Sequence, residues 1–357
     1  MDGRDGIESL SGEPVLAVCG FSGAGKTTLL EAVIPRLVGR GLAVAVVKHD
    51  AHGLHVDRPG KDSDRLYRVG ADVVLRGPDE SLCRRHGGVE LVSEVLTLLA
   101  RHDLVLVEGH KRTPLAKVWL EHPAQGGSPG PPCETGPGDL ESLCAVLAPG
   151  DGRQEALLAI VEERLAAAHA ARPLCAGILV GGRSERMGRP KQLLEVGGES
   201  MLDRAARAIE PFAGRPVALG AGPLPAAWAA AVRLPDPPGL TGPAAGLLAA
   251  LRWAPRTSWL LAPCDLPRIH AAAVAWLVEQ RRPGRWAVLP SLDGVHPEPL
   301  LAVYEPQARS LLEREALTGG GPSRLAGHPR TALVEIPEGL RDAWRDADTP
   351  GELPPSP

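Results

Sequence analysis

The sequence predicts an α/β protein built from two doubly wound parallel-sheet domains. The chain has 357 residues, which is long for a single domain. Strand-like apolar runs alternate with helix-like segments along most of it, as expected for parallel sheets covered by helices. Two of the apolar runs lead directly into glycine-rich loops. We therefore expect one domain at residues 1–171 and a second at residues 174–357.

The bulk composition narrows the class of protein. A formal net charge of −4 argues against a large nucleic-acid interface, and no apolar run is long enough to span a bilayer. The N-terminus is polar and acidic, unlike a secretion signal. Six cysteines are scattered without a C-x-x-C pair, which favours free thiols. These features predict a cytoplasmic protein without nucleic-acid or membrane partners.

The first glycine-rich loop carries a phosphate-binding motif. Residues 14–19 form an apolar strand-like run, residues 20–27 read G-x-x-x-x-G-K-T, and residues 29–39 have helical apolar spacing. Strand, loop and helix therefore follow one another in the order that a P-loop requires. Backbone N–H groups would surround the β-phosphate, Lys26 would reach the β and γ oxygens, and Thr27 would offer its hydroxyl to Mg²⁺. The nucleotide-binding residues predicted here are Gly20, Gly23, Gly25, Lys26, Thr27 and Thr28.

A carboxylate after a later strand is the candidate partner of this loop. The sequence predicts strands at residues 42–47, 71–75 and 104–107 and a helix at residues 63–70. Glu108 directly follows the third strand, where P-loop proteins place the residue that orients the metal. A charged end on a buried strand is the alternative reading of Glu108. Asp103, at the other end of the same strand, is interpreted as a cap.

The first domain is expected to extend beyond a Pro/Gly-rich segment. Residues 124–138 have the composition of a linker, but the strand-like run 143–147 and the helix-like run 154–171 are too little to fold alone. We expect them to complete the first sheet. The domain join is then short and lies near residues 171–173.

The second glycine-rich loop follows the apolar run 174–180. Gly181 and Gly182 allow the backbone to approach an anion closely, because neither carries a Cβ. Arg183, Arg186 and Lys191 then place three cations within nine residues, enough to neutralise a polyphosphate.

Alternating segments after this loop predict the second sheet. We expect helices at residues 201–211, 226–231 and 247–253, and strands at residues 216–219, 232–234 and 258–262. Ligands of such sheets bind beyond the carboxyl ends of the strands. Gly181, Gly182, Asp236 and Asp265 all fall in loops at these ends.

Two aspartates are the candidate ligand-contacting residues of the second sheet. Asp265 stands between two prolines after a buried run and is predicted to hold Mg²⁺; the alternative is a cap for the helix starting near His270. The carboxylate of Asp236 suits the two N–H donors of guanine, or it forms the turn before Pro237.

The motifs of the first half, GFSGAGKTTLLE, VVKHDAH, DRPGKDS and DLVLVEGHKRTPLAKV, resemble the molybdopterin-guanine dinucleotide adapter (MobB-type) family between residues 15 and 120. The resemblance implies a P-loop NTPase-like domain that binds GTP, hydrolyses it weakly, dimerises and assists a guanylyltransferase. No obvious water-orienting glutamine or arginine finger is found, although Arg65, Arg68 and Lys111 remain candidate cations.

The second half resembles the molybdenum cofactor guanylyltransferase (MobA-type) family in LVGGRSERMGRPKQLLEVGGESML, LPDPPGLTGPAAGLLAAL, LLAPCDLP and HPEPLLAVY. This implies a Rossmann-like nucleotidyltransferase that joins GMP from GTP to Mo-molybdopterin, with apo-molybdoenzymes or their chaperones receiving the product. Two departures are Val180, in place of a small residue, and Gly220, in place of an asparagine. The GTP-contacting positions implied are Leu179, Val180, Gly181, Gly182, Lys191, Asp236 and Asp265, with Lys191, Arg186 and Asp265 as catalytic residues.

Other functions stay open at this stage. A cytidylyltransferase of the same cofactor is the nearest, and Gly181-Gly182 together with the GPAAG stretch favours GTP over CTP. A GTP-regulated cofactor carrier and a sugar-1-phosphate nucleotidyltransferase are the others. His296 either touches the pterin or is an ordinary loop histidine.

Overall fold

The computed structural model describes residues 10–49, 54, 56–122, 142–181, 189–347 and 349–353. By contact density the chain divides into two compact units. The first comprises Met1–Val33, Ala45–Leu98 and Val105–Leu157, and the second comprises Ile34–Val44, Leu99–Leu104 and Leu158–Pro357. The domain boundary near residues 171–173 stays a prediction.

The first sheet has the strand order β2-β5-β1-β6-β7. Strand β1 pairs in parallel with β5 and β6, and β7 pairs in parallel with β6. The strands are β1 (Val15–Gly20), β2 (Val44–Lys48), β5 (Leu104–Glu108), β6 (Lys117–Leu120) and β7 (Leu143–Leu147). Because these parallel strands share a direction, the loops after β1, β5, β6 and β7 lie at one edge of the sheet. The expectation that the strand at residues 143–147 completes this sheet is confirmed.

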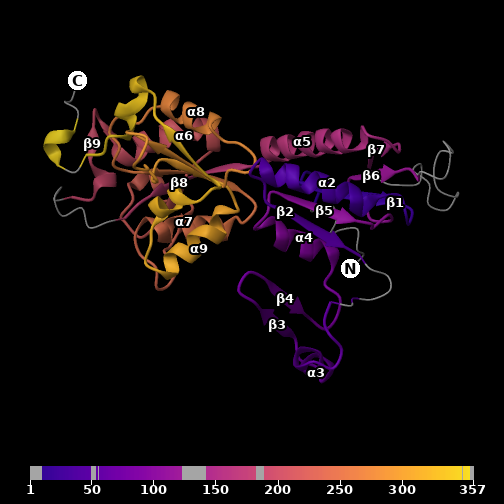
Figure 1. Ribbon diagram of the computed structural model, residues 1–357. Helices are drawn as coiled ribbons and strands as arrows, with labels where there is room; N and C mark the ends of the chain where they lie inside the picture. Colours follow the sequence, from indigo (N-terminus) through magenta and orange to yellow (C-terminus); the bar gives the residue numbers. More distant parts are fainter. Residues whose placement is uncertain are drawn as a thin grey trace. The chain divides into compact units, whose positions relative to one another are not determined.

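Three helices accompany this sheet (Figure 1): α2 (Lys26–Gly39), α4 (Leu91–Leu99) and α5 (Arg153–Ala171). In α5 the apolar residues Leu157, Leu158, Val161 and Leu165 recur at helical spacing and are all buried. Strand β6 was not predicted. Its four residues are completely enclosed and include the buried Lys117, whose charge masks the apolar pattern that marks a strand.

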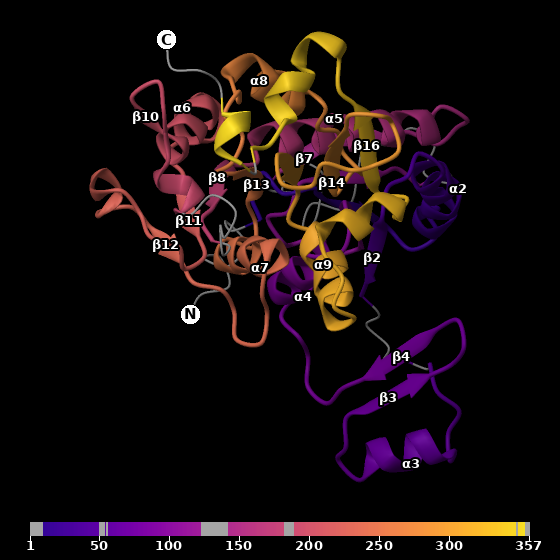
Figure 2. The same cartoon turned by 90° about the vertical axis from the view of Figure 1, so that its left-hand side faces the viewer.

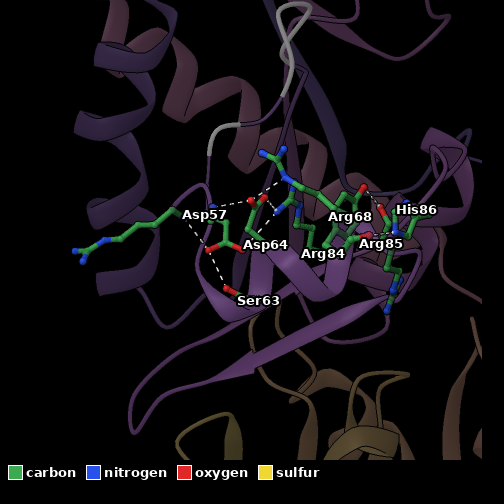
Figure 3. A network of polar contacts seen from close by, with 10 residues as sticks. Asp57, Ser63, Asp64, Arg68, Arg84, Arg85 and His86 are labelled. Atoms are coloured by element: carbon green, nitrogen blue, oxygen red, sulfur yellow. Dashed lines mark hydrogen bonds and ion pairs between the residues drawn. The ribbon is translucent and has the colours of Figure 1, made fainter.

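A small helix-and-hairpin segment follows β2. Helix α3 (Asp62–Arg68) lies beside the two antiparallel strands β3 (Val73–Arg76) and β4 (Ser81–Arg84) (Figure 2). Its polar centre is Asp64, whose carboxylate accepts from the Gly60 N–H at 2.8 Å, Arg68 Nε at 2.8 Å and Arg84 Nη1 at 3.0 Å (Figure 3). The Gly60 N–H first, and then the Arg84 guanidinium, lower the pKa of Asp64. This carboxylate therefore ties the loop before α3 to β4.

The second sheet has the order β12-β11-β8-β13-β15-β14-β16. Strand β15 is antiparallel to both of its neighbours, and the other pairs are parallel, so the predicted mostly parallel sheet is confirmed. The strands are β8 (Leu174–Leu179), β11 (Val217–Leu219), β12 (Arg233–Leu234), β13 (Ser258–Pro263), β14 (Ala287–Ser291), β15 (Ala302–Tyr304) and β16 (Thr331–Glu335).

Helices cover both faces of the second sheet (Figure 1). On one face lie α6 (Met201–Ala213) and α8 (Ala271–Glu279), and on the other lie α7 (Pro243–Trp253) and α9 (Ala308–Leu317). Each face has its own core of buried apolar side chains. In the part of the chain that the structure describes, no helix is long and apolar enough to cross a membrane.

Two predictions for the second sheet are wrong in detail. Residues 226–231 were expected to be helical, but the structure has a single 3₁₀ turn at Ala226–Trp228, because one turn is enough to bury Trp228. Helix α7 begins at Pro243, four residues earlier than predicted. Proline suits the first position of a helix, and the turn before it is made by Gly242 at φ 73°.

Candidate functional site

The P-loop connects β1 to α2 through a strongly curved backbone. Gly23 and Gly25 have φ values of 80° and 84°, which glycine adopts without a steric penalty. Ala24 between them is buried. Residues Lys26, Thr27 and Thr28 form the first turn of α2, so the free backbone N–H groups of the helix N-terminus lie beside the loop.

Lys26 folds over its own loop. Its ammonium group donates to the carbonyl oxygens of Phe21 at 2.8 Å and Gly20 at 3.3 Å. Burial lowers the pKa of Lys26, and the nearby Glu108 opposes this effect. The ammonium group of Lys26 therefore lies at the edge of the loop that would hold the phosphates, and it is partly shielded from water.

Thr27 and Glu108 meet, although 81 positions separate them. The Thr27 hydroxyl donates to the Glu108 carboxylate, with Oγ1 3.1 Å from Oε1 and 3.2 Å from Oε2. Glu108 is the last residue of β5 and is buried, and Lys48 Nζ lies 3.6 Å from its Oε1. A hydroxyl and a carboxylate held this close fit the oxygen-ligand preference of a hard divalent cation.

Sequence reasoning missed Arg153, which braces the loops of the first sheet. Its guanidinium donates to the carbonyl of Ala24 in the P-loop at 2.9 Å and to that of Glu121 after β6 at 2.8 Å. It also donates to Leu147 and Ala148, at 2.9 Å and 3.0 Å, at the end of β7. One side chain thus fixes three successive strand ends, and no local motif could have revealed contacts across 129 residues.

A cleft of about 210 Å³ opens at the carboxyl ends of β8, β11 and β13 in the second unit. It contains six of the predicted GTP-contacting residues: Leu179, Val180, Gly181, Lys191, Asp236 and Asp265. Gly242 and Pro243, at the start of α7, also line it. Gly182, Arg183 and Arg186 lie outside the described residues.

Lys191 and Asp265 form an ion pair in this cleft. Lys191 Nζ donates to Asp265 Oδ2 at 2.9 Å, and both side chains are mostly buried. The alternative of a helix cap for Asp265 is not met, because α8 is capped by His270, whose Nδ1 accepts from the Ala273 N–H. A carboxylate neutralised by a lysine suits a site that takes up a cation together with a polyphosphate.

Gly220 explains one departure from the MobA-type pattern. Its φ is 109°, and a Cβ at this position would lie 2.7 Å from the carbonyl oxygen of Val180. An asparagine therefore does not fit this backbone. The same hypothetical Cβ would be 3.9 Å from Asp236 Oδ1, so Gly220 lies beside that carboxylate. Arg233 holds the loop in place by donating to the carbonyl of Gly220 at 2.8 Å.

A second, larger cavity of about 800 Å³ adjoins the cleft and shares Pro243, Pro263, Asp265 and Leu300 with it. Its further lining includes Leu292, Glu298, Ser323 and Trp344. The HPEPLLAVY stretch was noticed in the sequence, but Glu298 was not singled out. His296 of that stretch is exposed, and its Nδ1 lies 2.6 Å from Asp293 Oδ2, which suits an ordinary loop histidine.

The fold and the two sites define the class of this protein: a P-loop nucleotide-binding unit joined to a nucleotidyltransferase-like unit. Comparison with known families agrees. Residues 15–134 match the family described as molybdopterin guanine dinucleotide synthesis protein B, and residues 176–332 match the MobA-like NTP transferase domain.

Individual relatives match one part of the chain each. An adapter protein of molybdopterin-guanine dinucleotide biosynthesis from Haemophilus influenzae is 42% identical over 30% of this chain and 62% of its own length. The adapter from Escherichia coli K12 is 36% identical over 32% of this chain and 70% of its length. A probable molybdenum cofactor guanylyltransferase from Opitutus terrae is 31% identical over 49% of this chain and 89% of its length. The chain therefore belongs to the MobB adapter family in its first part and to the MobA-like transferase family in its second.

Proposed function

We propose that this protein transfers GMP from GTP to Mo-molybdopterin and releases pyrophosphate and molybdopterin guanine dinucleotide. The observation that carries the proposal is the position of Asp265, which lines both the cleft and the larger adjoining cavity. A donor nucleotide in the cleft and an acceptor in the cavity would meet at this carboxylate. Membership of the MobA-like transferase family supports the same reaction.

The proposed reaction is an in-line displacement at phosphorus. An oxygen of the acceptor's terminal phosphate attacks the α-phosphorus of GTP, and the bond from that phosphorus to the α–β bridging oxygen breaks. The attacking oxygen is already anionic, so no strong general base is needed. Positioning and charge neutralisation supply the catalysis.

The residues of the cleft would share this work. Lys191 would turn from Asp265 to the triphosphate oxygens, and the Gly181 backbone would approach them closely. Asp265 would hold Mg²⁺, which when bound neutralises the triphosphate charge. Asp236 would accept the N1–H and 2-amino donors of guanine, which cytosine cannot offer. Gly182 and Arg186, from the same glycine-rich loop, are proposed to contact the triphosphate as well.

The first unit is proposed to bind a second GTP as an accessory adapter. The P-loop geometry and the Thr27–Glu108 contact support Mg²⁺ and triphosphate binding there. Membership of the MobB adapter family supports GTP as the nucleotide. Dimerisation through this unit and delivery to apo-molybdoenzymes or their chaperones are proposed on the same ground.

A turnover assay tests the transferase proposal. The protein is incubated with Mo-molybdopterin, Mg²⁺ and either GTP or CTP, and the dinucleotide product is identified by its mass. We expect the guanine dinucleotide and much slower turnover with CTP. A cytosine dinucleotide would make the protein a cytidylyltransferase, and bound GTP without any product would favour the carrier function.

Asp265→Ala supplies the matching mutational test. We expect this variant to lose nearly all transfer, by at least about a hundredfold, while its thermal unfolding stays close to that of the parent protein, because the carboxylate is the shared charge of both cavities. Asp342→Ala, at an exposed carboxylate, is the control. Full Mg²⁺-dependent turnover by the Asp265 variant would remove this residue from the reaction.

A further inference from the structure

The larger cavity beside the nucleotide cleft contains a carboxylate with no assigned role. Glu298 lines this cavity, on the chain that leads into β15, and its backbone N–H donates to the Pro290 carbonyl at 2.7 Å. That bond fixes the backbone of Glu298 but leaves its side chain free to face a ligand. Among the residues that the structure describes, no hydrogen bond to the Glu298 carboxylate is made.

The other polar groups of the cavity are differently placed. The carboxylate of Glu352 accepts from the Thr349 N–H at 3.1 Å, and Asp346 is exposed. Trp344 directs its indole N–H to the Leu301 carbonyl at 3.2 Å and is therefore not a donor to the cavity. Arg345 and Ser323 also line the cavity, and Arg345 Nε lies 3.3 Å from Asp342 Oδ1. Asp265 is shared with the nucleotide cleft, so Glu298 is the half-buried carboxylate of this cavity without an assigned role.

The surroundings of Glu298 make ionisation of its carboxyl group unfavourable unless a partner donates hydrogen bonds to it. Burial, and then the nearby carboxylates of Asp346 and Asp293, raise the pKa of Glu298. Two N–H donors from a ligand would favour the ionised form again. The walls formed by Leu292, Pro299 and Leu300 suit a flat heteroaromatic ring beside this acceptor.

We propose that Glu298 recognises the acceptor by accepting hydrogen bonds from the N3–H and the 2-amino group of a pterin ring. A carboxylate has two acceptor oxygens side by side, and the 2-amino-4-oxo edge of a pterin presents two donors side by side. The terminal phosphate of the acceptor would then lie at the Asp265 end of the cavity. This assignment rests on the proposed function, because it identifies the part of the cavity that holds the acceptor's ring.

Ligand discrimination provides the test. The probes are 6-hydroxymethylpterin phosphate and the corresponding lumazine, in which a carbonyl oxygen replaces the 2-amino group. Binding to the full-length protein is followed by the fluorescence of the probes. We expect the parent protein to prefer the pterin by about tenfold or more, since charge-assisted hydrogen bonds are lost with the lumazine.

Glu298→Gln should reverse this preference. The amide offers one acceptor and one donor, which match the N3–H and C2 carbonyl of lumazine but leave the pterin amino group facing an N–H. Glu298→Ala should weaken pterin binding about tenfold or more without any gain for lumazine. Glu279→Gln, at an exposed carboxylate of α8 outside the cavity, should leave the preference unchanged. A Glu298→Gln variant that still prefers pterin overturns the proposal.

Two controls separate this inference from its premises. GTP affinity and thermal unfolding should be the same in all variants, which shows that each is folded with an intact donor site. Product mass from the parent protein tests the guanylyltransferase function independently. If the parent makes no dinucleotide yet discriminates the two probes through Glu298, the proposed reaction fails and the pterin assignment stands.

Discussion

The carboxylate of Glu305 is buried among cations in the second unit. It accepts hydrogen bonds from the Ser258 hydroxyl at 2.6 Å, Arg281 Nε at 2.9 Å and Arg172 Nη1 at 3.2 Å. Burial alone would oppose its ionisation, but the His169 ring and the guanidinium groups of Arg281 and Arg172 outweigh this and hold the pKa of Glu305 well below its ordinary value. Removing one member of such a buried network lowers the stability of the fold strongly, because the remaining charges lose their partner.

Glu305→Ala is therefore expected to lower the free energy of unfolding by about 3–5 kcal/mol, because it leaves two buried guanidinium groups without their counter-charge. Glu313→Ala is the control: its partners Arg252 and Arg309 are partly exposed, so about 1 kcal/mol or less is expected. Urea unfolding followed by circular dichroism measures both. Equal losses in the two variants would contradict the role given to Glu305.

The pH dependence of the Glu305 contribution has a defined sign. A carboxyl whose pKa is lowered on folding stabilises the native state fully above its unfolded pKa. The contribution is lost as the pH falls through the lowered native value. The difference in unfolding free energy between the parent protein and Glu305→Ala should accordingly shrink in acid and stay constant above neutrality.

Local motifs predicted the candidate residues of both glycine-rich loops one by one. Lys26 and Thr27 follow from the P-loop spacing, Lys191 from the cations of the second glycine-rich loop, and Asp265 from its place after a buried run. The structure places Lys26 and Thr27 after β1, and it brings Lys191 and Asp265 into one cleft. Glu298 could not be found in this way. Its proposed role depends on a cavity assembled from the segment before β15, the start of α7 and the segment near Trp344, which no single stretch of sequence describes.

At the level of elements, the P-loop depends on α5 as well as on its own glycines. Arg153, the first residue of α5, donates to carbonyls after β1, β6 and β7. These strands are neighbours in the first sheet, so one guanidinium holds adjacent turns at fixed spacing. The planar fork of arginine suits this task, and the single ammonium of lysine does not reproduce it.

Arg153→Lys should consequently weaken GTP binding by the P-loop by about tenfold or more, because the loop must be ordered anew when the nucleotide binds. Gln154→Ala, at the exposed neighbouring position of α5, should leave binding unchanged. Titration of the full chain with a fluorescent GTP analogue measures binding. Lys26→Ala, which is expected to lose P-loop binding, is the reference that leaves only the signal of the cleft. Unchanged affinity in the Arg153→Lys variant would show that the hydrogen bonds of Arg153 do not affect nucleotide binding.

The periodicity of apolar residues predicted the strands and helices that have a clear pattern within their own stretch of sequence. Strands β1, β5, β8 and β13 are continuous apolar runs, and α5 and α6 have helical spacing and clear ends. The hairpin strand β4 was missed because it is half exposed and carries Arg84, whose partner Asp64 lies 20 residues away. The order of the strands could not be predicted from this periodicity either, since β15 lies antiparallel between β13 and β14.

For the whole molecule, the question is whether the two candidate phosphate sites act separately. Each lies at the carboxyl edge of its own sheet and has its own acidic residue, Glu108 in the first and Asp265 in the second. In the part of the chain that the structure describes, neither set of residues contains a member from the other sheet. The chemistry of transfer is therefore expected to be complete in the second unit, and the first unit would affect delivery of the product.

Lys26→Ala tests this separation in the intact chain. The variant should lose nucleotide binding at the P-loop, since Lys26 holds its ammonium group at the edge of that loop, where it would reach the β and γ phosphate oxygens. GMP transfer in vitro should keep its kcat and its KM for GTP within about twofold of the parent values. Both are measured in the same preparation, with Lys61→Ala, an exposed lysine of the first unit, as the control. If transfer collapses together with P-loop binding, the two sites are coupled, and nucleotide in the first unit must be treated as part of the transferase mechanism.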